Sequence, residues 1–563
     1  MDSTTTTVWG IDLGTTYSCI ARIDETGHPV VVNNRDGDQI TPSVVMLVDA
    51  DMVEVGKSAK GQLQFEPDLV CELVKQNMGD PAWRFRAHDK EWTAPEVSSF
   101  ILKALAEDAA MQSGIPVERA VITVPAYFGV AEREATIAAG KMAGLIVEDV
   151  INEPTAAAFS YGFAQASDVD ETVLVYDLGG GTFDVTVIRL EPTGDGGSSI
   201  RVIATGGDDR LGGALWDERM VKLLAAKFAE MMPDAADPLD DDIASADLRL
   251  AAEDVKRALT KRDSVSQVVM AGVDRASVKV TRDEFEAATN DLLEQTIDFT
   301  RTTVGKAAAA GAATIDRVLL VGGSSFMPAV SRRLVEVFPD WVPELQDPNQ
   351  AVAKGAALAG LQAALRAMIA ATTGDEPGGE PPTAEQVKEV AAMAGISRSA
   401  AQAVLDTEVT NVCSRGFGVK VLRDDGDPSS DDDSNFHVVH IIEPNTPLPI
   451  DGSDPDRVKT FGTVRDNQQE VQICVMEQES RELTGDMAGN RQIEQGLFQM
   501  TRAYPRGAPI HIAIGMESNG TLRIRALDDD GREMEFAATT VGAVMSDEQL
   551  AESTSKVLAM QRA

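Results

Sequence analysis

Two short segments combine aspartate, glycine and threonine in the way that a phosphate-binding site requires. They are GIDLGTTYSCIA, from Gly10, and VYDLGGGTFDVTV, from Val175, and each reads as an apolar strand, a glycine turn and a second strand. Glycine lets backbone N–H groups approach a phosphate closely, threonine hydroxyls add donors, and a strand-end aspartate can hold a hydrated Mg²⁺. Ordinary glycine hairpins with solvated aspartates would explain one such segment. Because two matched segments occur, we favour a clamp that holds phosphate from both sides.

A third glycine turn, VGGSSFMP from Val321, follows the apolar run RVLL and is predicted to face the same ligand. Gly56-Lys57-Ser58 mimics the end of a P-loop, but Asp51 stands where the first glycine of that motif belongs. We therefore expect the phosphate ligand at the matched turns rather than at a P-loop.

The elements that must hold these turns follow an α/β pattern, because apolar strand-like runs alternate with alanine-rich helical stretches up to about residue 372. The duplicated strand-turn-strand segments predict two lobes. Short strands separated by turn residues then predict a sandwich. The predicted domains are an α/β nucleotide-binding domain over 1–372, a Pro/Gly linker and helix pair over 373–409, a β-sandwich over 410–541, and a short C-terminal helix over 542–563.

Composition excludes several classes of protein. The 563 residues include 50 basic and 90 acidic ones, and the net charge of −40 disfavours nucleic acid and anionic membrane as partners. The four cysteines form no CxxC, so neither a disulfide framework nor a zinc ribbon is predicted. MDSTTTT lacks the features of a signal peptide, and no apolar run approaches the roughly 18 residues of a membrane span. We expect a cytoplasmic monomer.

The predicted helix pair, AEQVKEVAAMAG and SRSAAQAVLD, bends at Gly395 in the manner of a helix-turn-helix. Acidic residues outnumber basic ones between Thr383 and Val409, so the pair has no basic face with which to read DNA. We therefore favour an interdomain spacer or a pair of helices that docks a partner.

In this order and spacing, GIDLGTTYSCIA, VITVPAYF, INEPTAAAFSYG, VYDLGGGTFDVTV and VLLVGGSSFMP resemble the heat-shock protein 70 (DnaK-type) chaperone family. HIIEPNTPLP, FGTVRDNQQEV, YPRGAPIHIAI and NGTLRIRALD resemble the peptide-binding sandwich of that family. The resemblance covers most of the chain. It implies an α/β actin-like two-lobed ATPase domain followed by a mainly β sandwich, with ATP and Mg²⁺ as ligands and extended polypeptides as clients.

The resemblance also implies roles for individual residues. The catalytic positions are Lys75, Glu153, Asp177, Thr182 and Asp184. The nucleotide-binding positions are Asp12, Gly14, Thr15, Thr16, Tyr17, Gly179, Gly180, Gly181, Thr182, Gly206, Glu253, Lys256, Arg257, Gly322, Gly323, Ser324 and Phe326. Mg²⁺ would be held by Asp12 and Asp177 through water. Without the resemblance, Lys75 reads as a surface lysine, Glu153 as a helix-start carboxylate, and the Glu253 group as surface ion pairs.

At the base end of the site the chain departs from the family, because Phe326 stands where the family usually has an arginine that packs on adenine. An aromatic ring at this position could still stack on the base. In the sandwich, the positions that match the family's peptide contacts are Val419, Leu422, Phe461, Val464, Val471 and Ile473. Each of these six could instead be a residue of the sandwich core.

Three further departures bear on regulation. The family's short leucine-rich acidic linker is replaced by the Pro/Gly tract and helix pair, which puts coupling between ATP and peptide in doubt. Only about 20 residues follow the sandwich where the family has a helical lid, so we expect weak, fast-exchanging peptide binding. Asp149, after Glu148, stands where the family commonly places a basic residue that docks J-domains, and the reversed charge opposes that docking.

These observations predict an ATP-hydrolysing chaperone of the heat-shock protein 70 class, with unfolded polypeptides and a nucleotide-exchange factor as partners. The alternative is a nucleotide-sensing interaction protein whose slow or vestigial ATPase accompanies docking of one dedicated partner. An actin-like small-molecule kinase is disfavoured, because the appended β domain resembles peptide binders and no acceptor site is apparent in the sequence.

Overall fold

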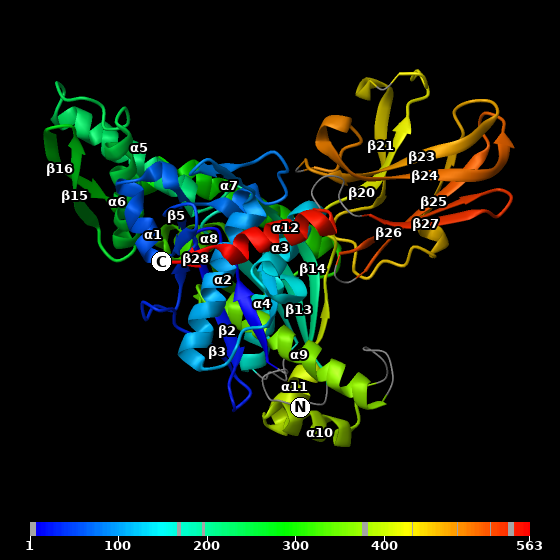
Figure 1. The fold of residues 1–563 in the computed structure, drawn as a ribbon, viewed down its shortest axis with the longest axis horizontal. Helices are drawn as coiled ribbons and strands as arrows, with labels where there is room; N and C mark the ends of the chain where they lie inside the picture. The colour runs from blue at the N-terminus through cyan, green and yellow to red at the C-terminus, as the bar shows by residue number, and fades with distance from the viewer. Residues whose placement is uncertain are drawn as a thin grey trace.

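The structure is a computed structural model that describes residues 7–165, 170–193, 198–373, 381–430, 432–480, 482–517, 520–538 and 545–563. Figure 1 shows an α/β body with a separate β domain at one end. The fold is therefore the expected actin-like body followed by a sandwich. The body has two lobes, each built on a mixed sheet of six strands.

Lobe I is built on the sheet β11-β10-β1-β2-β3, with β4 also paired to β2. Its strands are β1 (Val8–Asp12), β2 (Tyr17–Ile23), β3 (Pro29–Val31), β4 (Thr41–Pro42), β10 (Arg119–Val124) and β11 (Ile146–Asn152). Its helices are α1 (Lys57–Gly61), α2 (Ala94–Ser113) and α3 (Val130–Met142). Trp9, Ile11 and Ile122 are fully buried in the core beneath α2 and α3. The turn between β1 and β2 carries the first phosphate loop, so this core fixes its position.

Lobe II is built on the sheet β18-β17-β12-β13-β14-β19. Its strands are β12 (Glu171–Leu178), β13 (Phe183–Pro192), β14 (Ser198–Asp208), β17 (Arg317–Val321), β18 (Pro343–Leu345) and β19 (Glu408–Thr410). Around it lie α5 (Gly213–Met231), α6 (Asp242–Leu259), α7 (Arg282–Ala309), α8 (Pro328–Val337) and the hairpin of β15 (Ser264–Ala271) and β16 (Asp274–Thr281). Because β12 and β13 are antiparallel, Asp177 lies directly opposite Asp184.

Two helices cross between the lobes. The helix α4 (Glu153–Gln165) follows a strand of lobe I and packs on β12, β13 and β14 of lobe II, whereas α9 (Ala351–Thr373) packs on β1 and β2 of lobe I. Where they cross, a Cβ on Gly355 would lie 1.7 Å from the carbonyl oxygen of Ala156. Glycine is therefore required at this crossing, which joins the lobes below the cleft.

The helix α9 corrects one expectation from the sequence. By length and composition alone, Ala351–Thr372 is long and apolar enough to cross a membrane, although no such run was expected. Lys354 and Arg366 interrupt this segment, which is why it does not stand out as an uncharged run. In the fold it packs against α4, β1 and β10, which is the position of a core helix.

The helix pair that follows the α/β body is packed against that body. The helices α10 (Ala384–Ala394) and α11 (Arg398–Leu405) bury an apolar face that includes Val387 and Val404 against α9. The amide of Gln362 on α9 donates to the backbone oxygens of Val404 and Thr407, both at 2.6 Å. The next residues form β19, which adds to the edge of the lobe II sheet by pairing with β14. Most of the preceding Pro/Gly tract, residues 374–380, lies outside the described residues.

The β domain consists of two antiparallel sheets, β21-β20-β23-β24 and β22-β25-β26-β27. Their strands are β20 (Phe417–Leu422), β21 (Phe436–Ile442), β22 (Val458–Gly462), β23 (Gln468–Gln478), β24 (Asn490–Tyr504), β25 (Pro509–Met516), β26 (Leu522–Asp528) and β27 (Glu533–Ala538). Their inward side chains, such as Val475, Phe498 and Ile524, form one core between the sheets. This arrangement is a β-sandwich.

After the sandwich, the chain returns to lobe I. The helix α12 (Asp547–Ala559) packs on α2 and α3, and β28 (Gln561–Arg562) pairs with β6 (Met52–Val55) in a small sheet with β5 (Val45–Leu47) and β7 (Val70–Cys71). Figure 1 shows α12 lying across the α/β body and away from the sandwich sheets. The hairpin of β8 (Phe85–Ala87) and β9 (Lys90–Trp92) lies in the same lobe.

Candidate active site

The two glycine turns face each other across the interface between the lobes. The Gly14–Tyr17 turn joins β1 to β2, and the Gly179–Thr182 turn joins β12 to β13. A Cβ on Gly180 would lie 2.0 Å from Oγ1 of Thr16, and a Cβ on Gly181 would lie 2.4 Å from Cγ2 of Thr15. The turns approach so closely that only glycine fits on the lobe II side. The matched segments of the sequence therefore form the two opposed sides of one site.

These turns line a cleft of about 600 Å³. Of the positions expected from the sequence, the cleft brings together Asp12, Gly14, Thr15, Thr16, Tyr17, Lys75, Glu153, Asp177, Gly179, Gly180, Thr182, Gly322 and Gly323. Sequence reasoning missed Ile40, Pro348, Asn349 and Val352, which also line it. Ile40, Pro348 and Asn349 lie in loops without a glycine motif and Val352 lies at the start of α9, so no local signal identifies them.

Most of the charged side chains that line the cleft carry carboxyl groups. Burial, and after it the neighbouring charge of Glu153, raise the pKa of Asp12 to about 7, although Lys75 opposes this shift. Burial also raises the pKa of Asp177 and of Asp184 well above the ordinary value, with Glu153 again the next cause. One ammonium group cannot compensate this much negative charge, so the site favours an additional cation.

Lys75 provides the only positive charge among the described residues that line this cleft. It lies in a short 3₁₀ turn, Val74–Asn77, and its Nζ donates to Oε1 of Glu153 at 2.6 Å, with both side chains buried. The pair makes Lys75 a fixed buried cation rather than a mobile surface lysine. The ammonium group could therefore contact a terminal phosphate, and Glu153 could orient a water molecule.

The residues present fit a hydrated Mg²⁺. Oδ1 of Asp184 is buried without a hydrogen-bond partner among the described residues, and Asp177 lies opposite it. The described residues form no cluster of three side chains that could ligate a metal directly. Mg²⁺ commonly keeps several waters and binds through one or two carboxylates plus phosphate oxygens. Asp12 and Asp177, acting through water, are consistent with this mode.

The base end of the site joins the two lobes through a polar group on α6. The hydroxyl of Tyr17 donates to Oε1 of Glu253 at 2.7 Å and accepts from Arg257 at 3.0 Å, and Lys60 forms an ion pair with Glu253. Lys60, on α1 of lobe I, follows the sequence that mimics a P-loop, and it was not predicted from the sequence. The group therefore bridges the cleft, and it also includes an ion pair along one helix, because Arg257 lies 3.7 Å from Glu253.

The remaining expected positions lie around the cleft without lining it, as far as the described residues show. Ser324 Oγ donates to the Gly179 carbonyl oxygen at 2.9 Å, and Lys256 is held by Asp217 at 2.8 Å. Phe326 is 42% exposed. Gly206 lies in β14, where a Cβ would be 2.4 Å from Oγ1 of Thr303, so this glycine accommodates close packing of α7.

The six expected peptide contacts do not share one environment. Val419 and Ile473 are buried in the sandwich core, and Phe461 and Val471 are partly buried against it. Leu422 and Val464 are half-buried at the ends of β20 and β22. The residues that remain partly accessible to an extended peptide are therefore Leu422, Phe461, Val464 and Val471.

A buried ionic group joins the sandwich to the ATPase body. Glu477 of β23 is fully buried, and its carboxylate accepts from the backbone N–H of Val130 at the start of α3 and from Arg491 at 2.8 Å. Arg415 lies 3.5 Å from Glu477 and 3.8 Å from Glu132 of α3, and donates to the Tyr127 carbonyl oxygen at 3.1 Å. The charged residues of this group are separated along the sequence, so no local pattern predicted that they would meet. It makes the sandwich part of one body with the ATPase domain.

Beside this group, Asp149, Arg133 and Cys413 line a cavity of about 580 Å³ between the sandwich and lobe I. The backbone N–H of Tyr127, in the same loop that Arg415 contacts, lowers the pKa of Asp184 against the larger effect of burial. The interface is therefore only one loop away from the carboxyl cluster of the cleft.

Comparisons with known proteins agree with this architecture. The model of the family described as Hsp70 protein matches residues 8–82 and 64–367. Chaperone protein DnaK of Thermotoga petrophila is 34% identical over 555 residues, which cover 96% of this chain and 82% of the relative, and that of Thermotoga sp. strain RQ2 gives the same figures. DnaK of Thermotoga neapolitana is 34% identical over 546 residues, 94% of this chain and 80% of the relative. The chain belongs to the Hsp70 family and is an ATPase of the DnaK-type chaperone class.

Proposed function

We propose that the protein hydrolyses ATP in the cleft between the two glycine turns and uses the sandwich to engage extended apolar segments of unfolded polypeptides. The observation that carries this proposal is the opposition of the two turns above a cluster of buried carboxyl groups with Lys75 beside it. Phosphoryl transfer to water needs positioning and charge neutralisation more than covalent chemistry. The cleft supplies both.

The proposed roles follow from the positions of the groups. Backbone amides and hydroxyls of the two turns hold the phosphates, and Lys75 contacts the terminal phosphate. Glu153 and Asp184 orient the attacking water, while Asp12 and Asp177 hold Mg²⁺ through its water shell. When bound, Mg²⁺ neutralises charge on the phosphate oxygens. Tyr17, the α6 group and Phe326 hold the nucleoside.

On the sandwich, we propose Val464, Leu422, Phe461 and Val471 as the accessible part of the peptide site, with Val419 and Ile473 supporting it from the core. Backbone hydrogen bonds would provide affinity and apolar pockets specificity. In this arrangement α12 packs on lobe I and does not cover the sandwich. We therefore expect a bound peptide to exchange quickly.

Partners and location follow from the same reasoning. We propose unfolded polypeptides as clients in the cytoplasm, assisted by a nucleotide-exchange factor. Asp149 is exposed beside the cavity between sandwich and lobe I, so its negative charge would repel the acidic group of a J-domain that pairs with a basic residue at this position. We expect a J-domain that relies on a basic residue at this position of its chaperone to bind weakly.

The test is ATP turnover by the purified protein, with and without an unfolded peptide. Turnover that the peptide stimulates, and that Lys75→Ala abolishes in both conditions, would support the chaperone proposal. Lys57→Ala is the matched control, because Lys57 lies on the surface, 3.8 Å from Asp38, and should leave turnover unchanged. A rapid dissociation of labelled peptide is expected in parallel, and slow dissociation would contradict the proposed open site.

A second candidate is a nucleotide-sensing interaction protein with a slow ATPase. The buried charges of Arg415, Glu132 and Glu477 favour it, because they hold the sandwich against the ATPase body. ATP binding without any response of turnover to peptide would favour this second candidate over the first.

A further inference from the structure

The helix pair α10–α11 is a unit that the local sequence defines. Thr383 caps the start of α10 with a capping box, and Gly395 ends this helix in the left-handed region, with a φ of 71°. The side chain of Ser397 then accepts from the backbone N–H of Ala400 and begins α11. A cap at each helix start and a glycine at the bend determine where the two helices begin and where they turn.

The helix pair is anchored on α9, which also helps to join the two lobes. Figure 1 shows both helices beside α9 at one end of the α/β body. Their buried side chains, such as Val390 and Leu405, lie in the same core as Leu361 of α9 and Phe159 of α4. The amide of Gln362 on α9 fastens the end of α11 through its two hydrogen bonds to backbone carbonyl oxygens. The pair is therefore continuous with the crossing of α4 and α9.

The turn between β2 and β3 of lobe I reaches the helix pair. At its tip, Gly27 has a φ of 87°, and a Cβ on it would lie 2.4 Å from Cβ of Ala400 and 3.8 Å from Cβ of Ile396. Beside it, the His28 ring meets the Phe163 ring of α4 edge-on, with 5.8 Å between the ring centroids. The contact is so close that α11 leaves no room for a side chain at Gly27.

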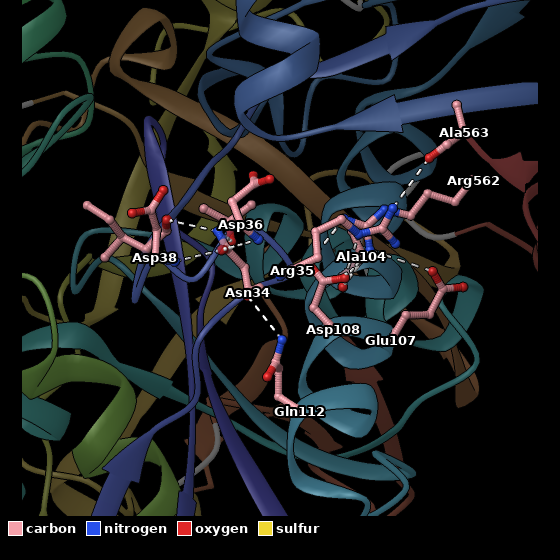
Figure 2. A network of polar contacts seen from close by, with 12 residues as sticks. Asn34, Arg35, Asp36, Asp38, Ala104, Glu107, Asp108, Gln112, Arg562 and Ala563 are labelled. Carbon is pink, nitrogen blue, oxygen red and sulfur yellow. Dashed lines mark hydrogen bonds and ion pairs between the residues drawn. The ribbon is translucent and has the colours of Figure 1, made fainter.

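The strands that carry this turn connect it to the nucleotide cleft. Strand β2 begins at Tyr17, the last residue of the first phosphate turn, and pairs with β3. After β3, Oδ1 of Asn34 accepts from the backbone N–H groups of Asp36 and Asp38, which fixes the loop that follows (Figure 2). A shift of the turn at Gly27 would therefore move the first phosphate turn through β2.

Lobe II has the corresponding arrangement on its own side. Strand β13 begins at Phe183, directly after the second phosphate turn, and ends at Pro192. The hydroxyl of the next residue, Thr193, donates to the carbonyl oxygen of Asp406 at the end of α11, at 3.4 Å. From there the chain enters β19, which pairs with β14 of the same sheet. Each phosphate turn is thus followed by a strand whose far end contacts the helix pair.

The helix pair therefore joins the far ends of β2 and β13, while the two phosphate turns occupy their near ends. Clefts between lobes open by rotation of one packed body against the other. Because both strands lie within packed sheets, a rotation that moves the turns apart must also change the separation of the far ends. Helices that are packed on both far ends oppose that change.

We propose that the helix pair acts as a brace that keeps the two phosphate turns opposed, with Ala400 and Gln362 as positioning residues for nucleotide binding. This rests on the proposed nucleotide cleft. While the helix pair is docked, bound nucleotide leaves slowly; when its contacts are loosened, the turns separate more easily and nucleotide leaves faster. Because coupling between two equilibria is reciprocal, nucleotide in the cleft also stabilises the docked helix pair.

The first experiment measures how fast N-methylanthraniloyl-ADP, a fluorescent ADP analogue, dissociates from the full chain when excess unlabelled ADP is added in a stopped-flow instrument. Ala400→Leu places a larger side chain against Gly27, and we expect it to speed dissociation roughly 5- to 50-fold, within the usual range of coupling between sites. Gln362→Ala removes both hydrogen bonds to the end of α11 and should act in the same direction. Ala392→Leu is the matched control, because it makes the same substitution on the exposed face of α10 and should leave the rate unchanged.

The second experiment follows amide hydrogen exchange in residues 384–405. Saturating ADP should slow exchange there in the wild-type protein and have little effect in Ala400→Leu. If the helix pair is only a spacer, the variants would lower the melting temperature while ADP dissociation and the ADP effect on exchange stayed at wild-type values, and this result would overturn the proposal. If Ala400→Leu fails to fold, Gln362→Ala still decides the question, because it only shortens a half-buried side chain.

The cleft and the helix pair can be tested separately. If the wild-type protein binds no ADP, or if Lys75→Ala and Gly180→Ala leave turnover and affinity unchanged, the proposed cleft is wrong. If the wild-type protein binds ADP and both Ala400→Leu and Gln362→Ala release it at the wild-type rate, the cleft stands and only the role of the helix pair is refuted.

Discussion

The nucleotide cleft and the proposed peptide face of the sandwich are built from different kinds of chemical groups. The cleft uses backbone groups at glycine turns and a few buried charged side chains, such as Lys75 and Glu153. The peptide face uses apolar side chains, and Ile473 and Val419 among them are also core residues. A site of the first kind is separable from the stability of its domain. In the second kind, binding and folding depend on the same atoms.

This difference predicts opposite behaviour under mutation. Changes in the cleft should alter chemistry or affinity and leave the melting temperature nearly unchanged, because buried, mutually repelling carboxyl groups add little to stability. Changes in the sandwich should alter stability and peptide affinity together, except at the strand ends. Three measurements test whether substitutions in the cleft and in the sandwich differ in this way.

The largest effect is expected for Glu153→Gln. Its carboxylate lies 2.6 Å from Lys75 and raises the pKa values of Asp12, Asp177 and Asp184. Loss of a positioned acid-base group typically costs about 10²- to 10⁴-fold in rate, so we expect single-turnover ATP hydrolysis to fall at least 100-fold. The melting temperature should not fall, since the substitution removes a repulsive charge.

Glu148→Gln is the matched control for this variant. Glu148 lies five positions earlier and pairs with Arg119 near the surface at 2.8 Å. Its hydrolysis rate should match that of the wild type. A comparable loss of rate in both variants would mean that the effect comes from the strand β11 and not from the cleft.

A smaller effect is expected for Gly180→Ala. The added Cβ would lie 2.0 Å from Oγ1 and 2.7 Å from Cβ of Thr16, so rotation of the threonine cannot relieve the clash. Overpacking of this kind costs about 1–3 kcal/mol, which corresponds to roughly 5- to 150-fold weaker ATP binding if the turns move apart. Affinity is measured by isothermal titration calorimetry.

Gly179→Ala supplies the comparison, because its Cβ would meet the Thr182 carbonyl oxygen at an ordinary contact distance of 3.5 Å. It should bind ATP within a few fold of the wild-type affinity. Equal losses in the two variants would show that flexibility of the turn, rather than its contact with Thr16, controls binding.

The cleft could be predicted from the sequence where its function depends on backbone geometry. Only glycine fits at Gly180 and Gly181, where the two turns come close together, so the glycine motif indicates the contact between the lobes. Lys75 and Glu153 could be assigned only through the family resemblance, because a lysine and a glutamate at single positions carry no signal of burial. Their ion pair joins residues from two distant segments and exists only in the folded chain.

The interfaces between domains could not be predicted for a related reason. Arg415, Glu477 and Glu132 are separated along the chain, and each reads as a surface charge until the fold brings them together. Arg562 and Asp108 are also far apart in the sequence, and their ion pair forms only in the folded chain. Periodicity and composition did predict a helix at the end of the chain and short strands in the sandwich, since those patterns are local. The surface on which each element docks is not encoded locally.

The smallest effect concerns the sandwich and compares Ile473→Val with Val464→Ala. Ile473 is 2% exposed in the sandwich core, so loss of one methylene should cost about 1 kcal/mol and lower the melting temperature by a few degrees. Val464 is half-buried beside the end of β22, so its truncation should weaken peptide binding several-fold with little change in stability. Thermal unfolding and fluorescence anisotropy of a labelled peptide measure the two quantities. If Val464→Ala lowers stability as much as Ile473→Val and leaves peptide affinity intact, the strand ends are core as well, and the peptide face must lie elsewhere on the sandwich.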